Sequence, residues 1–170
     1  LQTLRAPPPV PERHARPYSP LTIPHAPMPS VKTPDLRSVL ESAQTIAVVG
    51  CSGTTSRTSH KIARYMQNRG YRIVPVNPNY ETILGEPCYS DLPSVPPDLT
   101  IDVVNIFRRP RHTADMVRTA IERVDQTGER PVIWTQLGVS STEAEKLASK
   151  AGLPYVRNRC IKVAYDRLLA

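Results

Sequence analysis

The sequence has little of what would indicate a disulfide-stapled, metal-binding or membrane-spanning protein. Its three cysteines are an odd number at unrelated spacings, so they predict neither a disulfide framework nor a zinc site and fit a reducing compartment. No apolar run approaches the roughly 18 residues that cross a bilayer, so no membrane partner is expected. Aromatic residues are only 5% of the chain and do not alternate with basic ones, so a stacking platform for single-stranded nucleic acid is not indicated.

Glycine and proline are unevenly distributed and divide the chain into two parts. No glycine precedes Gly50, whereas ten of the 19 prolines lie in residues 1–34. A proline-rich segment favours extended polyproline II and buries too little apolar surface to fold alone. We therefore predict a basic extended arm over residues 1–34 and a folded domain over residues 35–170.

The charge of this arm suggests its partners and its location. It carries four basic residues and one acidic residue, within a chain of net charge +7. A stiff basic segment suits contact with an RNA phosphate backbone without readout of bases, so we expect it to contact RNA phosphate and neighbouring proteins. The chain begins with Leu1 rather than Met and is acid-poor at its start, as after loss of a transit peptide. We expect the mitochondrial matrix, with the cytoplasm as the alternative.

From residue 45 onward, apolar strand-like runs alternate with helical patterns. The expected strands are residues 45–50, 71–76, 101–107, 132–135 and 154–157. The expected helices are 59–69, 111–124, one opened by a capping box at Ser140–Glu143 and ending at Gly152, a short one capped by Asp35 and a last one over 161–168. This alternation predicts an α/β fold: a doubly wound, mostly parallel, five-stranded Rossmann-like sheet. Ligands of such sheets bind beyond the carboxyl ends of the strands, where the strand order reverses.

The loop after the first strand has the residues of a phosphate cradle. Gly50 permits a tight turn, Ser52 and Ser59 supply hydroxyls, and the following helix supplies backbone N–H groups, reinforced by Arg57. The dinucleotide fingerprint is incomplete, and the turn after the second strand, residues 76–78, has no acidic residue for ribose, so ordinary NAD selection is weakly indicated. The lack of G-K-[ST] excludes a P-loop.

Groups suited to catalysis are few. Cys51 lies near a helix N-terminus, which lowers a thiol pKa, and His60 follows nine residues later, but a small residue in a tight turn is the better interpretation of Cys51. No carboxylate pair occupies two strand-end loops, and the four histidines have no metal-ligand spacing. The sequence predicts neither an enzyme nor a metal site.

Several short motifs, taken together and in order, resemble the small stand-alone proteins of the CoA-binding-domain family, which share the Rossmann-like fold of the CoA-binding part of succinyl-CoA synthetase. The resemblance covers roughly residues 40–168 and omits the arm. These motifs are Ala47–Ser52, Ser59-His60, Gly70-Tyr71, Pro75–Pro78, Gly85, Tyr89, Asp102–Asn105, Phe107-Arg108, Trp134–Gly138 and Asn158–Cys160.

The resemblance implies CoA as the ligand, with NAD or another adenine dinucleotide as the alternative. The ligand would lie across the first loop, with residues 76–78 and Phe107-Arg108 flanking its adenosine end. The chain departs from the family pattern in the first loop, where the family commonly has prolines, and at Asn158, where it has Asp. The expected cofactor-binding residues are Gly50, Cys51, Ser52, Arg57, Ser59, His60, Val76, Asn77, Pro78, Phe107, Arg108 and Gln136.

Two functions remain open on these grounds. The first is a non-catalytic CoA- or adenine-dinucleotide-binding protein recruited as a structural subunit of a large RNA–protein assembly such as the mitochondrial ribosome. The alternative is a free-standing soluble CoA-binding protein with a disordered arm. In either case we expect Gly50→Val to abolish ligand retention, because a branched side chain would enter the pyrophosphate path.

Overall fold

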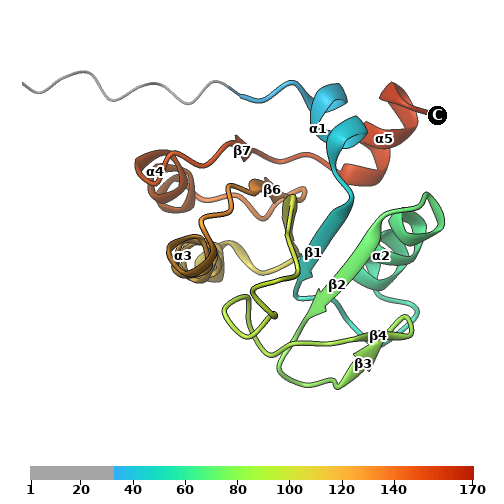
Figure 1. The fold of residues 1–170 in the computed structure, drawn as a ribbon. Coiled ribbons are helices and arrows are strands. Elements are labelled where there is room, and N and C mark those ends of the chain that lie inside the picture. The colour runs from blue at the N-terminus through green and yellow to red at the C-terminus, as the bar shows by residue number, and fades with distance from the viewer. Residues whose placement is uncertain (1–32) are drawn as a thin grey trace, which may run out of the picture.

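The computed structural model describes residues 33–170, and its centre is a five-stranded parallel sheet (Figure 1). Its strand order is β2-β1-β5-β6-β7, which confirms the predicted Rossmann-like α/β fold. The chain steps from β1 outward to β2 and then crosses to β5 on the other side of β1, so the order reverses between β1 and β5. The strands are β1 (Thr45–Val49), β2 (Arg72–Val76), β5 (Val103–Ile106), β6 (Val132–Thr135) and β7 (Tyr155–Val156). The predicted arm lies outside the described residues, apart from its last two positions.

Helices cover both faces of the sheet. Along β1, Ile46 and Val48 point to one core and Ala47 and Val49 to the other. Because both faces are buried, the strand is apolar from Ile46 to Val49 rather than alternating. One core is completed by α1 (Leu36–Ser42), α2 (Thr58–Asn68) and α5 (Ile161–Leu168), and the other by α3 (Pro110–Thr127) and α4 (Thr142–Lys150).

The connection from β2 to β5 has no helix, unlike the other crossovers in the sheet. It contains a small antiparallel hairpin of β3 (Thr82–Ile83) and β4 (Glu86–Pro87), which the sequence pattern did not indicate. After this hairpin the chain returns to the sheet. Tyr89 forms a parallel bridge with Val76: the Asn77 N–H donates to the Tyr89 carbonyl at 2.8 Å, and the Tyr89 N–H donates to the Pro75 carbonyl at 3.0 Å. Residues 89–92 therefore lie beside the end of β2.

The helix starts confirm one cap prediction and correct another. The Asp35 carboxylate accepts the Ser38 N–H at 3.1 Å, as expected of an N-cap. The capping box at Ser140–Glu143 was wrong by one residue, because the Ser141 hydroxyl caps α4 by accepting the Ala144 N–H at 3.1 Å. The Ser140 hydroxyl instead bonds the Thr135 hydroxyl and accepts the Asn158 N–H, which joins the ends of β6 and β7.

The third predicted strand is shorter than expected. Asp102 lies before β5, and its carboxylate accepts the N–H groups of Gln44 and Thr45 at 2.8 and 2.9 Å.

Within residues 33–170, no helix combines the length and apolar character needed to cross a bilayer.

Candidate functional site

A cavity of about 130 Å³ lies where the strand order reverses. It is bounded by the carboxyl ends of β1 and β2, by Arg108 two residues after the end of β5, by residues 90–92 and by one side of α3, in the place that the doubly wound topology predicts for a ligand. Its lining residues are Val49, Gly50, Val76, Asn77, Pro78, Ser90, Asp91, Leu92, Arg108, Met116 and Thr119.

The cavity suits one flat aromatic base. Its volume is close to the roughly 150 Å³ of a cavity that holds one benzene ring. Apolar walls come from both strand ends and from α3, and five polar side chains stand among them: Asn77, Ser90, Asp91, Arg108 and Thr119. A mostly apolar hollow with a few polar groups is the usual composition of a small-molecule site, in which the polar groups fix the orientation of the ligand.

Gly50 forms the tight turn between β1 and the first loop. Its φ of +83° favours glycine, and its N–H donates to the Val76 carbonyl at 2.9 Å. A Cβ on Gly50 would lie 2.5 Å from the Phe107 carbonyl oxygen and 2.9 Å from Cδ of Arg108. Gly50→Val would therefore collide with the protein's own backbone, so loss of ligand in that variant would not locate the pyrophosphate path as the sequence analysis expected.

Three side chains hold the first loop in shape. The Ser59 hydroxyl accepts the Ser52 N–H at 3.1 Å, and Nδ1 of His60 lies 2.8 Å from the Ser52 carbonyl oxygen. Because a carbonyl can only accept, this His60 nitrogen carries the proton. Asn77 Nδ2 donates to the Cys51 carbonyl at 2.8 Å. Ser59 and His60 are buried, so their side chains support the loop from inside.

The start of α2 keeps unpaired backbone donors. Its N-cap, Arg57, is exposed and makes no side-chain capping bond. Within residues 33–170, no acceptor takes the N–H groups of Thr58, Ser59 or His60. These N–H groups and the partial positive charge of the helix end fit a phosphate anion, which is the group that the sequence analysis expected here.

The middle of the same loop is held by an aromatic side chain that the sequence analysis did not single out. The ring of Tyr80 packs so closely on Gly53 that a Cβ there would lie 2.5 Å from it. Side-chain hydrogen bonds with Ser52 and Thr54 lower the pKa of Tyr80. Tyr80 thus fixes the loop from the side of the β3–β4 hairpin.

Cys51 is not an activated thiol. It is fully buried in the core beneath α2, and this burial, with a smaller contribution from neighbouring Cys88, raises its pKa to about 12. The expected lowering by a helix N-terminus was wrong, because removal of the thiolate from water outweighs the helix dipole here. Cys51 fills the tight turn as a small apolar residue, which was the preferred interpretation.

The remaining expected residues lie outside the cavity. Phe107 is partly buried against the α1/α2/α5 core, with its carbonyl oxygen above Gly50. Gln136 is buried, and its Nε2 donates to Asn105 Oδ1 at 3.0 Å. Five of the twelve expected residues line the cavity: Gly50, Val76, Asn77, Pro78 and Arg108. The other seven form or support the loops around it or lie behind them, and their contact with a ligand stays a prediction.

The structure adds one acidic residue that the sequence analysis did not place at the site. Asp91 lines the cavity beside the end of β2, where the strand itself has no acidic residue. Its Oδ1 accepts the Ser94 N–H at 2.9 Å, and Oδ2 has the longer 3.4 Å contact with the Ser90 hydroxyl. Oδ2 therefore has capacity for a ribose hydroxyl. The pairing of Tyr89 with Val76 brings Asp91 beside the end of β2, and this tertiary contact has no local sequence pattern.

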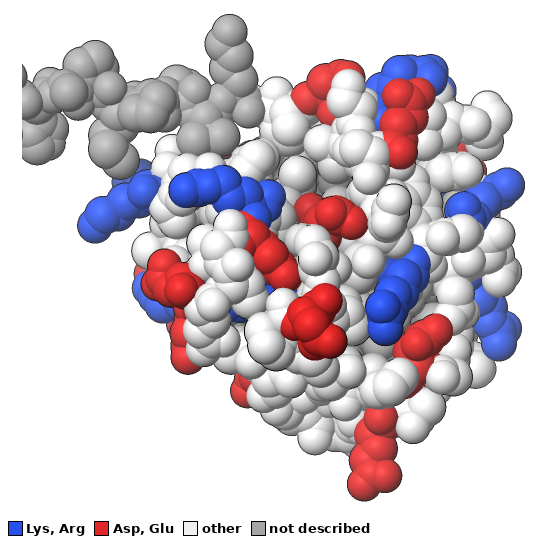
Figure 2. All heavy atoms as spheres, viewed as in Figure 1, with Lys and Arg blue, Asp and Glu red and all other residues white. Residues whose placement is uncertain are grey.

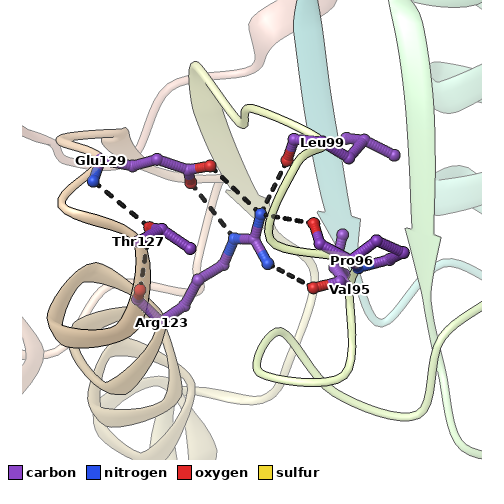
Figure 3. A network of polar contacts seen from close by, with 6 residues as sticks. All are labelled: Val95, Pro96, Leu99, Arg123, Thr127 and Glu129. Atoms are coloured by element: carbon purple, nitrogen blue, oxygen red, sulfur yellow. Dashed lines mark hydrogen bonds and ion pairs between the residues drawn. The ribbon is translucent and has the colours of Figure 1, made fainter.

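A buried ion pair anchors the chain that follows Asp91 (Figure 3). Arg123 of α3 is 2% exposed, and its guanidinium contacts both carboxylate oxygens of Glu129 at 3.1 and 3.2 Å. It also donates to the carbonyls of Val95, Pro96 and Leu99 at 2.5, 3.2 and 2.7 Å. The three bonds to carbonyls fasten an irregular segment to the helix that forms one wall of the cavity, and the two bonds to Glu129 neutralise the buried guanidinium.

A Rossmann-like sheet with a base-sized cavity at its switch point and unpaired helix N–H groups nearby is the architecture of a nucleotide-binding domain. The family model described as "CoA binding domain" matches residues 44–166, so the chain belongs to the CoA-binding-domain family. The resemblance predicted from short motifs is thereby confirmed.

Relatives match this chain over most of their own length. The Bacillus subtilis protein YneT is 35% identical over 131 residues, which are 77% of this chain and 92% of YneT. A solved structure from Pyrococcus horikoshii has a TM-score of 0.74 and 37% identity, and the match covers 80% of this chain and 91% of that one. One from Thermus thermophilus has a TM-score of 0.68 and 34% identity, with 79% and 96% covered.

Proposed function

We propose that this protein binds CoA through its adenosine diphosphate half, without catalysing a reaction on it. The observation that carries the proposal is the base-sized cavity at the switch point of the sheet. Gly50 lies in the wall of this cavity and begins the first loop, and the same loop ends at the unpaired N–H groups of α2. A base in the cavity and a pyrophosphate near α2 would use both features with one molecule. The family to which the chain belongs supports CoA as that molecule.

The residues present fit the parts of such a ligand. The apolar strand ends and Met116 suit an adenine ring, and Oδ2 of Asp91 is an acceptor for a ribose hydroxyl. The N–H groups of Thr58, Ser59 and His60 suit the pyrophosphate. Bound CoA would supply a thiol at the far end of its pantetheine arm, and the role of this chain is to hold and orient the nucleotide end.

NAD or another adenine dinucleotide is the second candidate, and Asp91 is the observation that favours it. An acidic residue beside the second strand is the group that selects a free ribose diol in dinucleotide-binding domains. The two candidates share adenine, ribose and pyrophosphate, so they would occupy the same cavity and differ beyond it.

Absence of catalysis is part of the proposal and has two supports. The thiol nearest the loop is protonated at neutral pH because its pKa is about 12. In residues 33–170, no group of three or more His, Cys, Asp or Glu side chains is placed to hold a metal ion.

A free-standing binding protein is the better supported setting for this activity. YneT and the P. horikoshii protein match this chain along 92% and 91% of their own lengths, so the matched module makes up nearly all of each relative. On the face of the domain seen in Figure 2, acidic and basic side chains are interspersed rather than gathered into a basic patch. RNA binding, membership of an RNA–protein assembly and a mitochondrial location remain predictions that depend on the arm.

Sedimentation of native extract with and without RNase tests the assembly hypothesis. A protein that sediments with large particles and is released by RNase would support it. A protein that stays at the monomer position in both samples would contradict it and favour the free-standing alternative.

Calorimetric titration tests the binding proposal. We expect the wild type to bind CoA, and we expect Thr119→Phe, which fills the cavity from α3, to lose that binding. Gln126→Phe adds the same ring to an exposed position of the same helix and should leave binding unchanged. Failure of the wild type to bind CoA or NAD, or equal binding by both variants, would contradict the proposal.

A further inference from the structure

A second pocket, strongly basic, adjoins the base cavity. It has a volume of about 330 Å³ and is lined by Phe107, Arg108, Arg109, Arg111 and His112. Three of these five side chains are permanently cationic, the fourth is a histidine, and none is acidic. Arg108 lines both pockets, so the two share this side chain as a common wall.

The positive charge of this pocket is not neutralised by the described part of the chain. The ion pairs within residues 33–170 involve Arg37, Arg118, Arg123, Arg157 and Lys162, and none involves an arginine of this pocket. Arg111 Nε donates a hydrogen bond to Nε2 of His112 at 3.0 Å, so Nε2 is an acceptor and Nδ1 is the ring nitrogen that can donate to a ligand. The three arginines are like charges held close together, and they favour an anion among them.

The backbone adds to the attraction. Arg109 is the N-cap of α3, a helix of 18 residues, and it makes no side-chain capping bond. Pro110 follows at the first helical position. The partial positive charge of the helix end thus coincides with the arginine cluster, and guanidinium groups bind a phosphate through paired N–H donors.

From this arrangement we propose that Arg108, Arg109, Arg111 and His112 bind the 3′-phosphate of the CoA adenosine. The inference rests on the proposed function, because it places the adenine and ribose in the neighbouring cavity. The 3′-phosphate is attached to the ribose, one bond beyond the part of the ligand assigned to that cavity. It is also absent from NAD, so the basic pocket makes the site selective for CoA.

Asp91 does not oppose this assignment. Its Oδ1 already accepts two donors from Ser94, and it lines the base cavity rather than the basic pocket. A 3′-phosphorylated ribose retains its 2′-hydroxyl, which is the donor that Oδ2 of Asp91 can accept.

The test compares CoA with 3′-dephospho-CoA by calorimetric titration. The wild type should bind CoA roughly 10- to 100-fold more tightly, as expected of one or two hydrogen bonds to charged groups. The variant Arg109→Gln/Arg111→Gln should lose most of this preference for CoA, with its affinity for dephospho-CoA unchanged. Both arginines are exposed, so the fold should tolerate the change, which circular dichroism checks.

A control removes the same charge elsewhere. Lys146→Gln/Lys150→Gln on α4 lowers the net charge by the same amount away from the pocket and should keep the preference for CoA. Equal wild-type affinities for the two ligands would overturn the inference and leave the proposed function standing, whereas binding of neither ligand would refute the proposed function itself. A preference for CoA that is undiminished in the arginine variant would also overturn the inference.

Discussion

Replacement of Arg123 by methionine tests how the cavity wall is held together. The substitution keeps much of the aliphatic volume but removes all five hydrogen bonds of the guanidinium. It leaves the Glu129 side chain, only 10% exposed, as an unpaired charge, and three carbonyls lose a donor. Removal of one partner from a buried pair costs about 3–5 kcal/mol.

Arg118 on the same helix is the matched control. It pairs with Asp115 and Glu143, but its side chain is 49% exposed, so Arg118→Met should cost less than about 1 kcal/mol. For the described residues 33–170, an unfolding entropy of roughly 2.1 cal/mol/K per residue makes each kcal/mol worth about 3–4 °C. We therefore expect the melting temperature to fall by about 10–15 °C for Arg123→Met and by less than about 4 °C for Arg118→Met.

Thermal and urea unfolding followed by far-UV circular dichroism measures both free energies. Arg123→Met/Glu129→Leu should recover part of the loss, because no lone charge then remains buried. The reasoning fails if Arg123→Met and Arg118→Met differ by less than about 1 kcal/mol, or if the double variant is less stable than Arg123→Met.

The remaining predictions concern the first loop. Gly50→Ala should destabilise the protein by about 1–3 kcal/mol more than Gly128→Ala. Both glycines have a positive φ, so the backbone strain of an alanine is similar at the two positions. At Gly50, however, the new Cβ would lie 2.5 Å from a backbone oxygen, whereas nothing lies within 4 Å of it at Gly128. Equal losses in urea unfolding would show that the close approach is unimportant. With a pKa of about 12, Cys51 should resist alkylation at pH 8 in the native protein and react once it is unfolded, so rapid native labelling of Cys51 in a peptide map would contradict its burial. Because burial raises this pKa from 9.0, Cys51 ionises at a lower pH in the unfolded protein than in the folded one. The free energy of unfolding should therefore fall as the pH rises from about 9 to 12, and this fall should be smaller in Cys51→Ala.

The sheet was predictable because its strands carry their signal locally. β1 is buried on both faces, so it appears in the sequence as an unbroken apolar run that ends in a glycine. The β3–β4 hairpin gave no such signal, because each strand has only two residues and Leu84 adopts a positive φ in the turn between them.

The candidate site was predictable only in part, for a physical reason. Gly50 and Asn77 follow directly from strand ends, and their place at the cavity depends on topology that the sequence pattern supplies. Asp91 reaches the cavity through a tertiary pairing, and the pKa of Cys51 depends on how deeply it is buried. Local motifs contain neither kind of information.

Titration of isotope-labelled protein with CoA, followed by two-dimensional amide NMR, tests the central claim most directly. The account predicts saturable shifts that are largest at Gly50, Asn77, the amides of residues 58–60 and Arg108. Shifts confined to α4 and β7, or spectra that stay unchanged at millimolar CoA, would contradict it.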